Sequence, residues 1–173
     1  HIDQRVADGI ISVIRSAYHT KHIIPIADSS LRYQAMCSAF PHEYDMLILD
    51  ATGPMTSISL VRKKLFIDVV GVSTVTGNAE WMESIMTEFS KLAERYPLPR
   101  TIFLIAQAEG DVASLQKKLS TANLGGLWLS DNPPTIVAVL PSHLNDLIKQ
   151  STASTPDLPL LLMALYYQHR VSE

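Results

Sequence analysis

The residues best suited to chemistry lie in one short turn between two apolar segments. Asp50 follows the apolar run 46–49, Gly53 lies in the turn, and Thr56 precedes the next apolar run, 58–61. A glycine lets backbone N–H groups approach a phosphate closely, so this layout is typical of a phosphate-binding turn. An Asp before a Gly-Pro pair is also common in ordinary turns, where its carboxylate accepts from the backbone two residues on. The spacing therefore leaves both interpretations open.

The segments around this turn alternate between helical and strand patterns. The predicted order is helix 3–18, strand 23–27, a helix from an Asp28-Ser29-Ser30 cap to about 39, strands 46–50, 57–62 and 65–71, a helix from about Thr76 to Tyr96, strand 101–106, helix 111–121, an extended segment near 127–130, strand 135–140, a short helix from Pro141, and a last helix 158–168. The short polar turn Arg62-Lys63-Lys64 predicts an antiparallel hairpin. This order favours an α/β domain with a mixed sheet and flanking helices.

Composition narrows the class of protein. The chain has 173 residues, of which 47% are hydrophobic and 18% charged, which favours one globular domain with a sizeable core. A net charge of -3 and a pI near 6.1 argue against a nucleic-acid surface, because phosphate backbones are bound by clustered Lys and Arg. The one cysteine, Cys37, excludes an intrachain disulfide and fits a reducing compartment, so we expect a cytoplasmic protein.

The ends of the sequence bear on its context. No run reaches the roughly 18 apolar residues of a membrane span. Because the first residue is His1 rather than Met, we expect residues 1–173 to be one domain excised from a longer protein. A position at the inner face of a membrane would then depend on missing segments or on a partner.

Other residues with chemical potential lack companions. Cys37 has no positioned histidine beside it in sequence, so a catalytic thiol is not expected. His19 and His22 stand near a helix end without the ligands that would complete a metal shell. The sequence therefore predicts no catalytic residue and no metal site here.

The element order and the turn at Asp50 resemble the second half of an actin-like domain, from the ATPase superfamily that includes actin, sugar kinases and the heat-shock seventy chaperones. The most similar members are FtsA-like and PilM-like proteins of bacterial cell division and type IV pilus assembly. The resemblance extends from about residue 3 to residue 170. It implies a ribonuclease H-like half domain that would hold Mg-ATP in a cleft against a second half.

The family's phosphate loop is similar to the turn but richer in glycine. Its pattern, Asp-x-Gly-Gly-Gly-Thr-Thr-Asp, reads here as Asp50-Ala-Thr-Gly-Pro-Met-Thr-Ser57. The resemblance implies that Asp50 positions a magnesium-bound water and that Gly53 and Thr56 contact phosphate. Pro54 departs from the pattern, since it has no N–H to donate.

The family's adenosine motif is altered as well. An apolar strand, 102–105, is present, but Ala106-Gln107-Ala108 stands where the family has glycines. Side chains there would fill space that a nucleotide needs. We therefore expect Asp50, Gly53 and Thr56 to form a vestigial phosphate and magnesium site, with no cofactor bound.

Two functions follow from the resemblance. The first is a noncatalytic protein-interaction or scaffold module of bacterial division, type IV pilus or secretion machinery. The second is the Mg-ATP-binding half of an ATPase that needs its missing partner half.

The last helix supplies a candidate interface. Leu160, Met163 and Tyr167 lie on one face, whereas Leu161 and Leu165 lie on another. One face is expected to pack in the domain and the other to contact a protein partner or a second copy of the chain.

Overall fold

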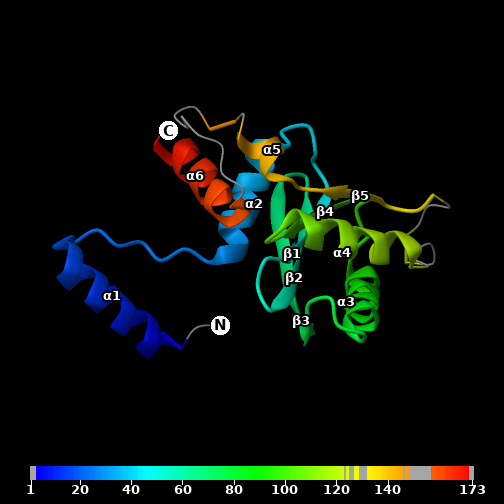
Figure 1. Cartoon of the computed structure of the whole chain (residues 1–173), viewed down its shortest axis with the longest axis horizontal. Coiled ribbons are helices and arrows are strands. Elements are labelled where there is room, and N and C mark those ends of the chain that lie inside the picture. The colour runs from blue at the N-terminus through cyan, green and yellow to red at the C-terminus, as the bar shows by residue number, and fades with distance from the viewer. Residues whose placement is uncertain are drawn as a thin grey trace.

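The computed structural model describes residues 3–122, 124, 127–128, 132–145, 147–148 and 157–171. Within these residues the elements, in chain order, are α1 (Gln4–Tyr18), α2 (Asp28–Ala39), β1 (Met46–Ala51), β2 (Met55–Arg62), β3 (Leu65–Val75), α3 (Trp81–Arg95), β4 (Thr101–Ala106), α4 (Glu109–Thr121), β5 (Thr135–Ala138), α5 (Pro141–Asn145) and α6 (Leu158–Val171) (Figure 1).

The five strands form one mixed sheet in the order β3-β2-β1-β4-β5. The β1–β2 and β2–β3 pairs are antiparallel, and the β1–β4 and β4–β5 pairs are parallel. The expected hairpin is confirmed, with Arg62 opposite Leu65 beside its turn. The expected fold class is also confirmed: an α/β domain with a mixed sheet and flanking helices, with strand order and directions that match a ribonuclease H-like half domain.

Helices cover both faces of the sheet. On one face α3 and α4 pack over a core that includes Trp81, Phe89 and Leu104. On the other, α2 and α6 pack over a core that includes Met36 and Phe103. Because both faces are covered, every residue of β1 is buried, and its sequence is an apolar run that only Asp50 interrupts.

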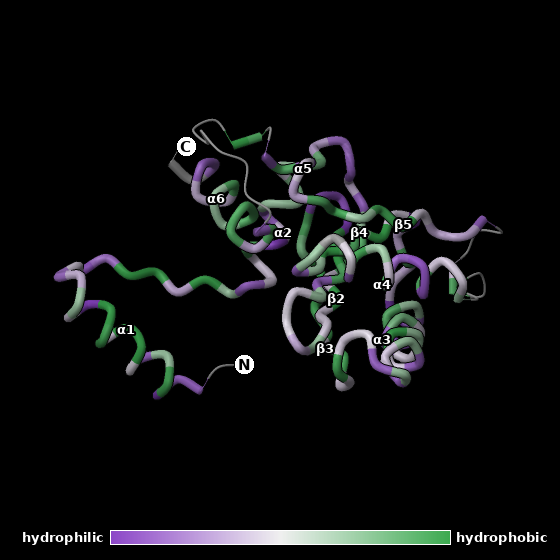
Figure 2. Tube along the Cα trace, in the orientation of Figure 1, coloured by the Kyte–Doolittle hydropathy of each residue, from purple (hydrophilic) through white to green (hydrophobic). Residues whose placement is uncertain are grey.

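Helix α1 lies apart from the sheet and its helices, joined to α2 by an extended connection (Figure 1). It contains no buried residue. The tube in Figure 2 shows hydrophobic positions recurring along α1 although the helix stands clear of the domain.

The predicted strand 23–27 in this connection is wrong, because the residues form neither helix nor strand. Ile24 is exposed, and Pro25 offers no N–H for a sheet ladder. An apolar run becomes a strand only where a sheet edge is available to pair with it.

Other predicted boundaries need correction as well, including the end of β3, which lies at Val75 rather than 71. Helix α2 begins at Asp28 itself, and its N-cap residue, Ala27, makes no side-chain hydrogen bond. Helix α3 begins at Trp81, because Thr76 and the following residues form a turn. Strand β5 ends at Ala138 rather than 140.

The predicted extended segment near 127–130 is only partly described. Leu127 and Trp128 do not lie in a strand, and 129–130 fall outside the described residues. The indole Nε1 of Trp128 donates to the Pro99 carbonyl at 2.7 Å, which anchors this segment beside β4. No helix in the described part of the chain is both long and apolar enough to cross a membrane.

Candidate functional site

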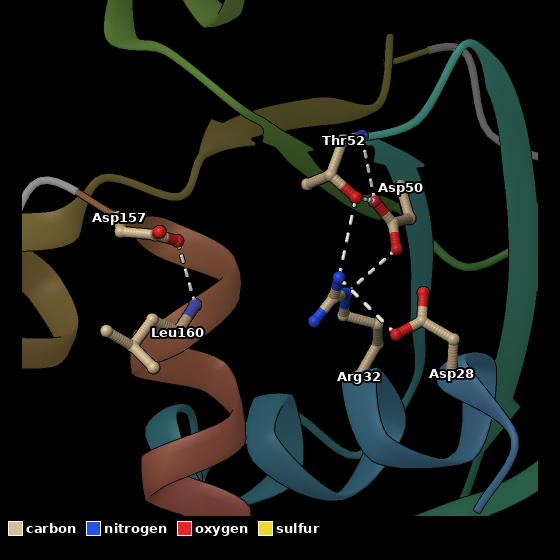
Figure 3. Close-up of polar contacts among 6 residues, drawn as sticks. All are labelled: Asp28, Arg32, Asp50, Thr52, Asp157 and Leu160. Atoms are coloured by element: carbon tan, nitrogen blue, oxygen red, sulfur yellow. Dashed lines mark hydrogen bonds and ion pairs between the residues drawn. The ribbon is translucent and has the colours of Figure 1, made fainter. Parts of the chain in front are cut away.

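Asp50 lies at the carboxyl end of β1, with 7% of its surface exposed. Its Oδ2 accepts from Arg32 Nε at 2.9 Å (Figure 3). Its Oδ1 accepts from the Thr52 backbone N–H at 3.0 Å and from the Thr52 hydroxyl at 2.6 Å. Both carboxylate oxygens are thus engaged by protein donors, and Asp50 makes the contact two residues on that a structural turn requires.

Arg32 is the site residue that sequence reasoning missed. It lies on α2, is 5% exposed, and also places Nη2 3.4 Å from the Asp28 carboxylate and 3.4 Å from the Thr52 hydroxyl oxygen. A signal for it was present in the sequence. Arg32 shares a helix face with Ala35 and Met36, three and four residues on, and a charge on a buried face requires a partner.

Asp28 is the outer member of this cluster. Partial burial raises the pKa of its carboxyl; the Arg32 guanidinium lowers it, and the nearby Asp50 carboxylate raises it again. Because the net shift is upward, the folded state disfavours ionised Asp28 relative to the unfolded chain, at pH values above its unfolded pKa. Asp50, which is buried and lies 2.9 Å from Arg32 Nε, is the inner partner of Arg32 in this cluster.

Thr56 is held on the opposite face of the sheet. Its buried hydroxyl oxygen accepts from Trp81 Nε1 at 2.8 Å and lies 2.9 Å from the Thr76 hydroxyl oxygen. Thr76 also fixes the turn itself, since its hydroxyl donates to the Gly53 carbonyl at 3.4 Å and its N–H donates to the Pro54 carbonyl at 2.9 Å. The Thr56 hydroxyl therefore ties β2 to α3.

Gly53 is not required by the shape of this turn. A Cβ placed on it would meet the Met55 carbonyl oxygen at an ordinary 3.6 Å. Its φ is not positive, whereas Gly77 has a φ of 77°.

Asp50, Gly53 and Thr56 are neighbours along the backbone, but the side chains of Asp50 and Thr56 are bound on opposite faces of the sheet. Asp50 is bound by Arg32 of α2, and Thr56 by Trp81 of α3, and these helices cover opposite faces of the sheet. Their side chains do not converge on one point in this arrangement. The phosphate and magnesium role of Asp50, Gly53 and Thr56 stays a prediction.

Two pockets flank the turn. The first, about 500 Å³, lies between Thr52-Gly53-Pro54, Thr76-Gly77 and the side chains of Gln107, Asp111, Ser114 and Lys118. Lys118 Nζ, the cationic group of this pocket, donates to the Gly77 carbonyl at 2.6 Å. Gln107 lies on the wall, so a side chain occupies a position where the resemblance places bare backbone.

The second pocket, about 630 Å³, lies on the α2 side of the turn. Asp28 and Asp50 both line it, together with Ser29, Ser57 and Val69. Two carboxylates at its wall make it a poor site for an anion.

The remaining candidates for chemistry are metal-binding clusters and the Cys37 thiol. Among the described residues, no three His, Cys, Asp or Glu side chains gather in a way that would hold a metal ion. Burial raises the pKa of the Cys37 thiol, which keeps it protonated and weakly nucleophilic.

The predicted interface helix is described over Leu158–Val171. The Asp157 carboxylate accepts from the Leu160 N–H at 3.0 Å and caps the first turn (Figure 3). Leu161 and Leu165 are buried, whereas the predicted interface residues are exposed. These exposed residues are Leu160, Met163 and Tyr167. The helix thus has one packed and one open face, and the partner role of the open face stays a prediction.

Comparison with known proteins finds structural similarity only at a low level. No protein-family model matches the chain, and neither does any curated protein. A solved structure with a similar arrangement is the type II variant of the Aquifex aeolicus Ppx/GppA phosphatase, at 12% sequence identity and a TM-score of 0.38. The match covers 84% of this chain and 54% of that one, so this chain spans about half the length of that protein. The fold assignment therefore rests on the strand order and directions.

Proposed function

We propose that this chain is a noncatalytic protein-interaction module, an actin-like half domain that serves as a scaffold in bacterial division, type IV pilus or secretion machinery. The observation that carries the proposal is the apolar face of α1, which no described residue of the chain covers. The occupied Asp50 carboxylate supports the noncatalytic part.

The stability of α1 requires a surface that buries its apolar face. The helix has 15 residues, and isolated helices of about 12–15 residues are marginal in water. Most helical stability in proteins comes from packing an apolar face, yet Val6, Ile10 and Val13 are all exposed, Val13 by 69%. A helix that is this amphipathic and this exposed is stabilised by burying its face against another surface.

The open face of α6 adds a second apolar surface. Leu160, Met163 and Tyr167 recur at helical spacing, with Tyr167 exposed by 69%. Contiguous apolar patches on soluble domains commonly mark protein contacts. Two such faces on one small domain suit a scaffold, which contacts more than one surface.

The turn at Asp50 supports the absence of catalysis. Asp50 accepts three hydrogen bonds from Arg32 and Thr52, which hold its carboxylate in the turn and leave it fewer lone pairs for a metal-bound water. Pro54 replaces a donor, and Gln107 occupies the wall of the adjoining pocket.

Substitution on α1 tests the interaction role. We expect the isolated chain to self-associate at high micromolar concentration, and Val6→Ser/Ile10→Ser/Val13→Ser to give a smaller sedimenting species, since a face built for a partner will also bind another copy. The melting temperature should be unchanged, because α1 buries nothing in the domain. Sedimentation velocity is the measurement.

The matched control lies on the polar face of the same helix. Arg5→Ser/Arg15→Ser should sediment like the unsubstituted chain. A chain that stays monomeric at high micromolar concentration, or α1 amides that are protected from hydrogen exchange in the monomer, would contradict the proposal.

A second candidate is the ATP-binding half of an actin-like ATPase that acts with a partner half. The pocket of about 500 Å³ between the Asp50 turn and α4 favours it, because this volume suits a small ligand.

Thermal unfolding with millimolar Mg-ATP tests whether the isolated chain binds the nucleotide without a partner half. We expect no shift in melting temperature. A ligand at 100 times its Kd would stabilise the fold by about 2.7 kcal/mol, which is a shift of several degrees. Mg-GTP and MgCl₂ alone serve as controls for nucleotide and metal effects, and a reproducible shift with Mg-ATP only would favour the second candidate.

A further inference from the structure

Strand β3 forms an open edge of the sheet. It is the first strand in the order β3-β2-β1-β4-β5 and has 11 residues, whereas the opposite edge, β5, has 4. Its two ends carry exposed apolar side chains, Leu65 at 62% and Val75 at 58%. A long edge strand presents a row of unpaired N–H and C=O groups, which another strand can bind.

One hydrogen bond shows which β3 backbone groups face outward. Val69 lies opposite Ser59 of β2, but its N–H donates to the carboxylate of its own neighbour, Asp68, at 2.8 Å. In an antiparallel strand the N–H and C=O of one residue point to the same side, and the side alternates along the chain. Val69 and Gly71 therefore direct their backbone groups toward the open edge.

The devices that usually block an edge are sparse on β3. Residues 65–75 contain no proline, lysine or arginine. The one charged residue, Asp68, is paired with Arg95 of α3 through Oδ2 at 2.9 Å, and its Oδ1 guards a single outward donor, the Val69 N–H. The pairing with β2 shifts register near each end of β3, which leaves a regular stretch from Asp68 to Gly71 in the middle.

We propose that β3 pairs with β3 of a second copy of this chain, antiparallel and centred on Val70, to join two sheets into one. Val70 is the midpoint of Leu65–Val75, so this centre pairs every residue of the strand. It sets Val69 opposite Gly71 of the second copy, where the Val69 N–H exchanges its bond to the Asp68 carboxylate for one to the Gly71 carbonyl of the second copy.

Side chains favour the same centre. Leu65 lies opposite Val75 of the second copy at both ends, so the two most exposed apolar residues of the strand cover each other. Asp68 lies opposite Val72, which keeps the two carboxylates from facing each other. This self-complementarity favours a second copy over an unrelated strand. The inference rests on β3 alone and is independent of the roles of α1 and α6.

Disulfide cross-linking of the full chain tests this register. In a Cys37→Ser background, Leu65→Cys/Val75→Cys should form a covalent dimer on mild oxidation, because opposite Cα atoms lie about 4.5–5.5 Å apart, within disulfide range. Either single variant alone should form no covalent dimer, since its two thiols would lie about 33 Å apart across the pair. Mixing the two single variants should give a dimer.

Variants on the strand and elsewhere serve as controls. Val69→Lys adds a natural edge guard and should abolish the cross-link, whereas Val69→Thr, which keeps the β-branched shape, should retain it. Ala113→Lys, at an exposed position on α4, should leave it unchanged, and each variant should keep the parent melting temperature within a few degrees. The proposal is overturned if the double variant does not cross-link, if the single variants cross-link as well as it does, or if Val69→Lys has no effect.

Discussion

Arg32→Met should lower the free energy of unfolding by about 3–5 kcal/mol, because it leaves the Asp50 carboxylate buried without its cationic partner. The methionine keeps most of the side-chain volume, so the loss reports mainly the uncompensated charge. Urea denaturation at neutral pH measures it.

A double-mutant cycle separates the charge from the packing. Asp50→Asn alone should cost about 2 kcal/mol, less than Arg32→Met, because Asp28 stays within reach of Arg32 and the amide oxygen can still accept from Thr52. A carboxylate that only held the turn would lose about 1 kcal/mol or less on this substitution, and the buried ion pair with Arg32 raises the expected loss. Arg32→Met/Asp50→Asn should recover part of the loss seen with Arg32→Met.

Two results would contradict this account of the ion pair. One is an Arg32→Met chain as stable as the unsubstituted one. The other is strict additivity of the two substitutions, since residues that share a buried ion pair must couple.

Trp81→Ala should also cost about 3–5 kcal/mol, because it empties a fully buried site at the start of α3 and removes the donor to Thr56. Trp81→Phe keeps an aromatic ring in that site and should cost about 1–3 kcal/mol, mainly through the lost hydrogen bond and the smaller ring. Urea denaturation of both variants gives the comparison.

Thr56→Val is the matched partner variant. It removes the acceptor and leaves the Trp81 N–H buried without a partner, so a loss of about 1–3 kcal/mol is expected. If Thr56→Val left stability unchanged, the hydrogen bond between β2 and α3 would not hold the turn as described.

Local patterns in the sequence determined much of the fold. The apolar runs at 46–49 and 102–105 predict strands, and the structure places both inside the sheet as the parallel pair β1 and β4. The short polar turn at 62–64 predicts the hairpin, because so short a connection can join only neighbouring antiparallel strands. Helical spacing likewise separates the two faces of α6, since the spacing alone sets which residues share a face.

The apolar run 23–27 shows a limit of prediction from local sequence. It carries the composition of a strand, but a strand also needs an edge to pair with, and that depends on the whole sheet. Asp28 is a residue type that often forms an N-cap. Here it is the first residue of α2, and its carboxylate pairs with Arg32 four residues on. A local motif states what a residue is able to do, and its neighbours in space decide which option it takes.

Tertiary structure determined which partners the polar side chains of the candidate site bind. The sequence alone predicted the turn and its candidate residues, Asp50, Gly53 and Thr56. It left open whether these residues bind phosphate or hold the turn. Arg32 is 18 residues from Asp50, and Trp81 is 25 residues from Thr56. Only the packing of α2 and α3 on opposite faces of the sheet brings these partners in, and buried polar groups take whichever partner the packed interior supplies, because leaving them unpaired costs more.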